Sequence, residues 1–105
     1  MTIGKKGLGN EYLTPDLCFT AWALSDSIAR ASRKLKGTGV INPRSKEAPS
    51  RMGIWFAATK SPLYTEYMNK RNSGEVKSEG PTIEEHEKYT AIFNKLVLEY
   101  HVKFG

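Results

Sequence analysis

The chain of 105 residues carries 16 Lys and Arg against 11 Asp and Glu, a net charge of +5, and 39% of its residues are hydrophobic. This length suits one domain with its own core, and this composition excludes intrinsic disorder. The lone cysteine, Cys18, excludes an internal disulfide, and no apolar run approaches the ~20 residues of a membrane span. Because Lys5 and Lys6 precede no apolar signal region, we expect an intracellular protein without membrane contact, with Cys18 as a small buried hydrophobe.

The first predicted helix covers residues 15–36. Thr14 is a suitable N-cap, Pro15 suits the first helical position, and Gly37 can end the helix with a positive φ. Apolar residues then recur at alternating steps of four and three, which places on one face Leu17, Ala21, Leu24, Ile28, Ala31 and Leu35. This spacing predicts one continuous helix with that face in the core.

Residues 37–49 form the least regular part of the chain, with two glycines and two prolines. A connection of this length is unusual, and such loops tend to be functional or mobile. We expect Val40 and Ile41 to attach its middle to the core. A short extended segment is the alternative, although the sequence offers no strand to pair with it.

Two short helices are predicted next, the first from residue 48 or 50 to residue 60 and the second over residues 62–72. The first has a helical stripe that we expect to be buried, formed by Met52, Trp55, Phe56 and Thr59. Ser61 and Pro62 begin the second as N-cap and first residue, and Tyr64, Tyr67 and Met68 line its inner face. The pair resembles a helix-turn-helix in geometry, with exposed polar residues of types that contact base edges: Thr65, Glu66, Asn69, Lys70 and Asn72.

The last predicted helix follows a capping box formed by Thr82 and Glu85. Its apolar stripe consists of Tyr89, Ile92, Phe93, Leu96, Tyr100 and Phe104. Further apolar residues widen the C-terminal half, which predicts a protein interface at Val97, Leu98, Val102 and Phe104. We therefore expect an all-α single domain of four helices over residues 1–105. The first and last helices form the long pair, the two short helices close one side, and residues 1–13 form a basic, Gly-rich arm.

Catalytic and cofactor motifs are weak in this sequence. His86 and His101 lie fifteen residues apart without a second ligand at metal spacing, and both are interpreted as partly exposed helix residues. The Gly37-Thr38-Gly39 segment follows a predicted helix, whereas a phosphate-binding loop precedes one. We expect no enzyme activity, no cofactor and no metal.

Positive charge concentrates in residues 30–51, here called the basic segment. Its single acid is Glu47, and its cations are Arg30, Arg33, Lys34, Lys36, Arg44, Lys46 and Arg51, a local charge of +6. This density is typical of phosphate-binding surfaces, and further contacts are predicted at Lys5, Lys6, Lys70 and Arg71. A second reading remains open, because Arg33, Lys34 and Lys36 also complement the helix dipole without any ligand.

These patterns predict a non-enzymatic nucleic-acid-binding protein, a regulatory or accessory factor that binds DNA rather than RNA and forms a dimer. The alternative is a protein-binding adaptor or inhibitor that docks on a larger complex through its apolar C-terminal helix. Both surfaces belong to the same chain, so composition does not separate the two classes.

Overall fold

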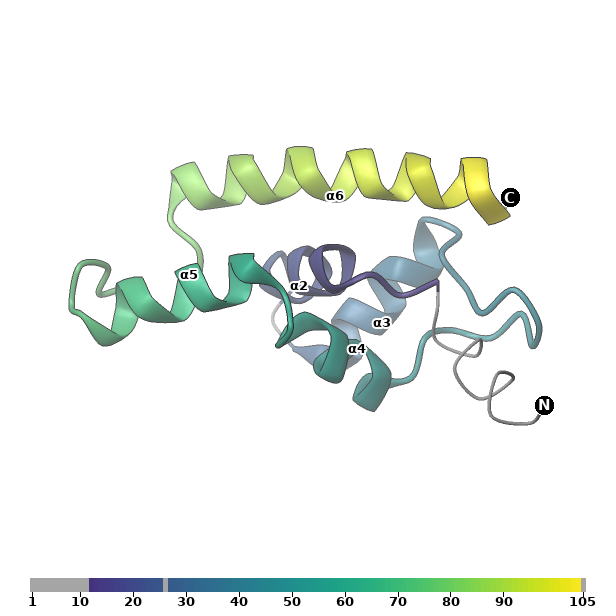
Figure 1. Ribbon diagram of the computed structural model, residues 1–105, viewed down its shortest axis with the longest axis horizontal. Coiled ribbons are helices and arrows are strands. Elements are labelled where there is room, and N and C mark those ends of the chain that lie inside the picture. The colour runs from purple at the N-terminus through teal and green to yellow at the C-terminus, as the bar shows by residue number, and fades with distance from the viewer. Residues whose placement is uncertain (1–11, 26, 105) are drawn as a thin grey trace.

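The computed structural model describes residues 12–25 and 27–104, which form five α-helices and no strand (Figure 1). The helices are α2 (Pro15–Ala23), α3 (Ile28–Gly37), α4 (Arg51–Ala58), α5 (Pro62–Asn72) and α6 (Ile83–Phe104). The predicted all-α single domain is confirmed, and the predicted number of four helices is wrong.

The extra helix arises because the predicted first helix is broken into α2 and α3. α2 ends at Ala23, and the Ser27 hydroxyl caps α3 by accepting a hydrogen bond from Arg30 N at 3.2 Å. Serine favours such caps because its side chain competes with the helical backbone for hydrogen bonds. The apolar spacing of four and three residues continues across the break between α2 and α3. The spacing alone therefore predicted one helix.

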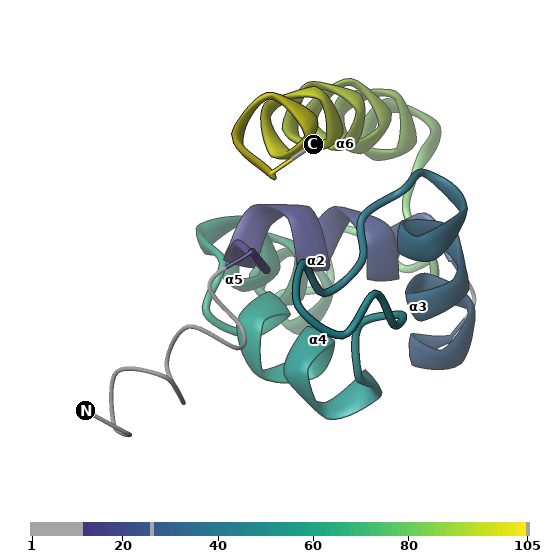
Figure 2. The same ribbon diagram turned by 90° about the vertical axis from the view of Figure 1, so that its right-hand side faces the viewer.

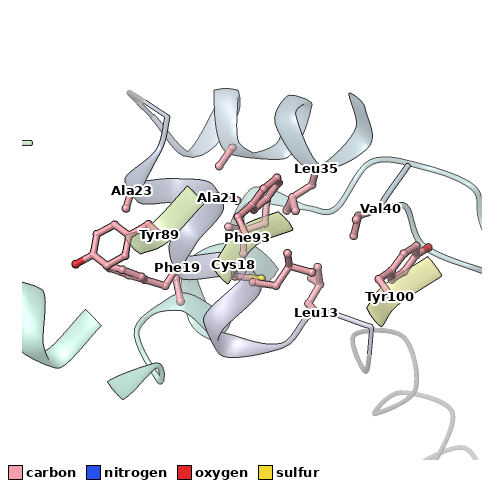
Figure 3. Packing of buried hydrophobic residues seen from close by; sticks show 14 of the residues in the cluster. Leu13, Cys18, Phe19, Ala21, Ala23, Leu35, Val40, Tyr89, Phe93 and Tyr100 are labelled. Atoms are coloured by element: carbon pink, nitrogen blue, oxygen red, sulfur yellow. The ribbon is translucent and has the colours of Figure 1, made fainter. Parts of the chain in front are cut away.

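α2 occupies the centre of the molecule. α6 covers one side of it, α4 covers the opposite side, and α3 and α5 complete the packing (Figures 1 and 2). Figure 3 shows Tyr89 and Phe93 of α6 against this helix, and the Tyr89 and Phe19 rings meet edge to face at 5.1 Å. Cys18 is fully buried as expected, and burial raises the pKa of its thiol to about 12. The predicted pairing of the first and last helices is confirmed for α2.

The last two residues of the predicted N-terminal arm pack into the core, and the rest of that arm lies outside the described residues. Tyr12 and Leu13 are buried, and the Tyr12 ring lies 6.2 Å from the ring of Tyr100. Both residues therefore belong to the core. Lys5 and Lys6 lie outside the described residues.

α4 presents the opposite face from the one predicted. Ile54 and Ala58 are fully buried, whereas Met52, Trp55 and Phe56 have exposed fractions of 69%, 40% and 58%. Both faces of this helix are apolar, so helical periodicity identifies a stripe without showing which one is buried. Ile54 and Ala58 therefore face the core, whereas Met52 and Phe56 face outward.

Arg71 and Glu85 join the end of α5 to the start of α6. Glu85 accepts hydrogen bonds from Arg71 at 2.7 Å and from Thr82 N at 2.9 Å, and Glu85 N donates to Thr82 Oγ1 at 3.1 Å. The capping box is therefore confirmed. The Arg71 guanidinium also stacks 3.6 Å from the Tyr67 ring centroid and donates to the Gly80 carbonyl at 2.8 Å. Arg71 was predicted to contact phosphate, and in this fold its guanidinium contacts Glu85, Tyr67 and Gly80.

The loss of stability at low pH should depend on Glu85. The hydrogen bond from Arg71 is the main cause that lowers the pKa of Glu85 from 4.5 to about 2. The folded state therefore favours the carboxylate, and the resulting stabilisation is present above about pH 4.5 and is lost as the pH falls to about 2. We expect Glu85→Gln to cost on the order of 3 kcal/mol at neutral pH, and much less at about pH 2. Urea unfolding followed by circular dichroism across this range measures both values.

Glu84→Gln is the matched control, because Glu84 is an exposed carboxylate in the same turn. Its cost should stay below about 1 kcal/mol, the ordinary contribution of a charge near a helix end. Parallel pH profiles for the unchanged protein and Glu85→Gln would contradict the assigned role of Glu85.

Candidate nucleic-acid interface

The basic segment is built from α3, the loop that follows it and the first residue of α4. Arg33 and Lys36 are exposed on α3, Arg44 and Lys46 are exposed in the loop, and Arg51 begins α4. Arg30 is also exposed, and Lys34 is half-buried. α3 and α4 pack against each other, and the loop between them extends to the end of the molecule that also holds the C-terminal end of α6 (Figure 1).

The centre of the loop is a compact turn. Asn42 Oδ1 accepts hydrogen bonds from Arg44 N at 2.9 Å and from Ser45 N at 3.3 Å, and Asn42 N donates to Glu47 O at 2.9 Å. Lys46 has a φ of +63°, in the left-handed region that residues other than glycine adopt rarely. The turn holds the exposed side chains of Arg44 and Lys46 on a defined backbone.

The C-terminal end of α6 fixes the start of this loop. Tyr100 Oη donates to the Ile41 carbonyl at 2.6 Å and accepts from Ile41 N at 3.3 Å. His101 Nε2 lies 2.7 Å from the Thr38 carbonyl. Since a carbonyl only accepts, Nε2 carries the proton in this contact. His101 is exposed, as expected. Its hydrogen-bond partner Thr38 lies 63 residues away in the chain, so no local sequence signal indicated this contact.

Two further contacts attach the loop to the core. Val40 is fully buried, as predicted, and Figure 3 shows it beside Tyr100. At the other end of the loop, Ser32 Oγ of α3 donates to the Pro49 carbonyl at 2.7 Å. The segment predicted to be functional or mobile is therefore anchored on both sides of its central turn.

Lys34 has a structural contact of its own. Its Nζ lies 5.3 Å from the centroid of the Phe93 ring, which connects α3 to α6 through a cation–π interaction. Lys34 and Lys36 also lie in the last turn of α3, where positive charge stabilises the helix dipole. The reading of these two lysines as helix-stabilising residues remains open beside phosphate binding.

α5 lies away from the basic segment and does not extend it. The C-terminal end of α5 and the loop of the basic segment lie at opposite ends of the long axis (Figure 1). Lys70 lines a cleft of about 420 Å³ whose walls also include Glu66, Glu75 and Glu84. The structure therefore brings neither Lys70 nor Arg71 to the predicted phosphate surface.

The predicted protein interface on α6 is exposed in part. Leu98 and Val102 have exposed fractions of 68% and 88%. Val97 is half-buried against the core, and the Phe104 ring lies 5.2 Å from the Tyr100 ring. The unpartnered apolar surface of α6 is therefore centred on Leu98 and Val102.

Other chemistries have little support in the described part of the chain. No three His, Cys, Asp or Glu residues there are grouped so that they could hold a metal ion. None of its helices is both long and apolar enough to cross a membrane.

No protein-family model matches this chain, and neither a curated protein nor a solved structure shows significant similarity to it. Its function is therefore inferred from the charges and contacts of its own residues.

Gly39 should be required for the anchoring of the loop. Its φ is +86°, and a Cβ atom at this position would lie 2.7 Å from Cε1 of His101. We expect Gly39→Ala to lower the free energy of unfolding by roughly 1–3 kcal/mol, because a left-handed backbone and a steric clash act together. Urea unfolding of the purified variant measures this loss.

Two other glycines provide matched controls. Gly37 has open space around it and no positive φ, so Gly37→Ala should be close to neutral, within about 0.5 kcal/mol. Gly74 shares the positive φ, at +82°, without a nearby atom, so Gly74→Ala isolates the backbone cost. Equal losses in Gly39→Ala and Gly74→Ala would show that the contact with His101 contributes nothing.

Proposed function

We propose that this protein binds nucleic acid without catalysis, as a regulatory or accessory factor, through the basic segment. The observation that carries the proposal is the concentration of seven cations and one acid on α3, the anchored loop and the start of α4. Each Lys or Arg that contacts a phosphate releases condensed counterions, so several cations on one face supply the affinity. We expect DNA rather than RNA as the ligand.

The anchored loop supports this proposal energetically. Binding costs less when the contacting side chains already stand on an ordered backbone. Arg44 lies on the compact turn, and Arg51 lies in the first turn of α4. Guanidinium groups form paired hydrogen bonds to phosphate oxygens, so these two residues are the strongest candidates for direct contacts.

Removal of the two arginines should weaken binding and its dependence on salt. We expect Arg44→Ala combined with Arg51→Ala to reduce the slope of log affinity against log salt by about 1.4 for a single strand or about 1.8 for a duplex. Fluorescence anisotropy with labelled mixed-sequence strands and duplexes, repeated across a salt series, measures this slope.

The control variant combines Lys70→Ala with Lys77→Ala, which removes the same charge from the end of the molecule that carries the C-terminus of α5. Its salt slope should match that of the unchanged protein. An equal reduction in both variants would show that net charge acts without a defined surface. No binding at about 50 mM salt, where phosphate contacts are strong, would refute the proposal.

A second candidate function is protein association through α6. The exposure of Leu98 and Val102 favours it, because these residues lie one helical turn apart and form an apolar surface. Lys95 and Glu99 flank them with opposite charges, which suits self-complementary pairing of two copies. A dimer of this kind would present two basic segments to one nucleic acid.

Charge on this α6 surface should prevent association. We expect Leu98→Asp combined with Val102→Asp to convert a concentration-dependent dimer into a monomer in sedimentation equilibrium, because a carboxylate cannot be buried there without a partner. Thr65→Asp combined with Asn69→Asp is the control, with the same spacing on exposed positions of α5. An unchanged protein that is monomeric at every concentration would contradict the dimer.

A further inference from the structure

The outer face of α4 is an apolar surface that the core does not use. Met52 and Phe56 are one turn apart on this face, and the exposed fraction of Phe56 is 58%. Trp55 is partly exposed beside them. Large exposed apolar side chains that are grouped in this way on a small protein often mark a binding surface.

The indole of Trp55 is held in place by two other aromatic rings. Its ring packs edge to face against Trp22 at 5.9 Å and against Tyr64 at 6.0 Å. Trp22 in turn lies 5.9 Å from Phe19 in the core. An aromatic ring that is supported on one side and exposed on the other is a rigid platform, so a flat ligand can stack on it with little loss of side-chain freedom.

Two exposed cations lie close to this platform in the sequence, and acids are absent from the same stretch. Arg51 lies one turn before Trp55, Lys60 is exposed just beyond the helix, and no Asp or Glu occurs between Glu47 and Glu66. The complementary ligand is therefore negatively charged and carries flat apolar groups. A single-stranded nucleic acid has this combination, because its unpaired bases expose their faces beside a phosphate backbone.

We propose that Phe56 and Trp55 stack on nucleic-acid bases, and that the ligand of the basic segment is single-stranded. This inference rests on the proposed function, because the basic segment supplies the phosphate contacts. A duplex keeps its base faces stacked inside the helix, so it would use the cations and leave the α4 platform empty.

The test separates base contacts from phosphate contacts. Affinity is measured for three probes: an oligothymidylate of about 12 nucleotides, within the site size of small single-strand binding domains, an abasic strand of the same length, and the corresponding duplex. We expect the oligothymidylate to bind at least about tenfold more tightly than the abasic strand, because this is the affinity that one stacked base contributes. Stacking should also quench the tryptophan fluorescence.

A variant of Phe56, a control variant and a variant of the basic segment identify the platform. Phe56→Leu keeps an apolar side chain and removes the aromatic face, so it should weaken binding of the oligothymidylate about tenfold and leave the abasic strand unchanged. Ile83→Ala, at an exposed apolar residue that begins α6, is the control and should change neither affinity. Arg44→Ala combined with Arg51→Ala should weaken binding of the oligothymidylate and of the abasic strand by the same factor. Circular dichroism confirms that each variant is folded.

The outcomes distinguish this inference from the function on which it rests. If none of the three probes binds, the proposed nucleic-acid function itself fails. If the strands bind but base and abasic forms are equal, or if the duplex is preferred, only the stacking proposal is overturned. Unchanged oligothymidylate binding by Phe56→Leu also overturns it and would favour a protein partner for the α4 face.

Discussion

Burial of the middle of α2, residues 17–21, is the constraint on which the rest of the structure depends. Leu17, Cys18 and Phe19 are consecutive residues with at most 1% exposure, so this part of the helix is enclosed on all sides. A helix that is apolar around its circumference is stable only when neighbours cover every face. α3, α4, α5 and α6 all pack against it. The one buried hydroxyl of α2 that could oppose this packing, Thr20 Oγ1, donates within the helix to the carbonyls of Asp16 and Leu17.

The covering of α2 accounts for the distribution of surface chemistry. Each of α4 and α6 buries one apolar face and leaves other apolar residues exposed. On α4, Ile54 and Ala58 turn inward and Phe56 turns outward. On α6, Tyr89 and Phe93 turn inward and Leu98 is exposed. The two candidate interfaces are therefore the outer faces of helices whose inner faces complete the core.

α6 connects the two candidate surfaces physically. Its last turns carry the exposed Val102, while Tyr100 and His101 hold the loop of the basic segment at Ile41 and Thr38. Three hydrogen bonds from one helix end keep a long connection ordered against its conformational entropy. An association at α6 would therefore act on the same turns that anchor the loop of the basic segment.

The sequence by itself determined the features that depend on neighbouring residues. Helix starts at Thr14, Ser61 and Thr82 were predicted correctly, because a capping side chain bonds to the backbone two or three residues ahead. The charge of the basic segment was equally readable, since it requires only counting. The cap at Ser27 was missed, because the apolar spacing continued through it and outweighed a single serine.

Only the tertiary structure decided the features that depend on distant residues. Periodicity showed that α4 has apolar stripes, but the space beside α2 selected the one containing Ile54. Arg71 resembled a phosphate contact until the fold placed Glu85 and the Tyr67 ring around its guanidinium. His101 acquired its role from a carbonyl 63 residues away. A side chain's partner across the core is set by how the helices pack, and that packing minimises the free energy of the whole chain rather than of any local segment.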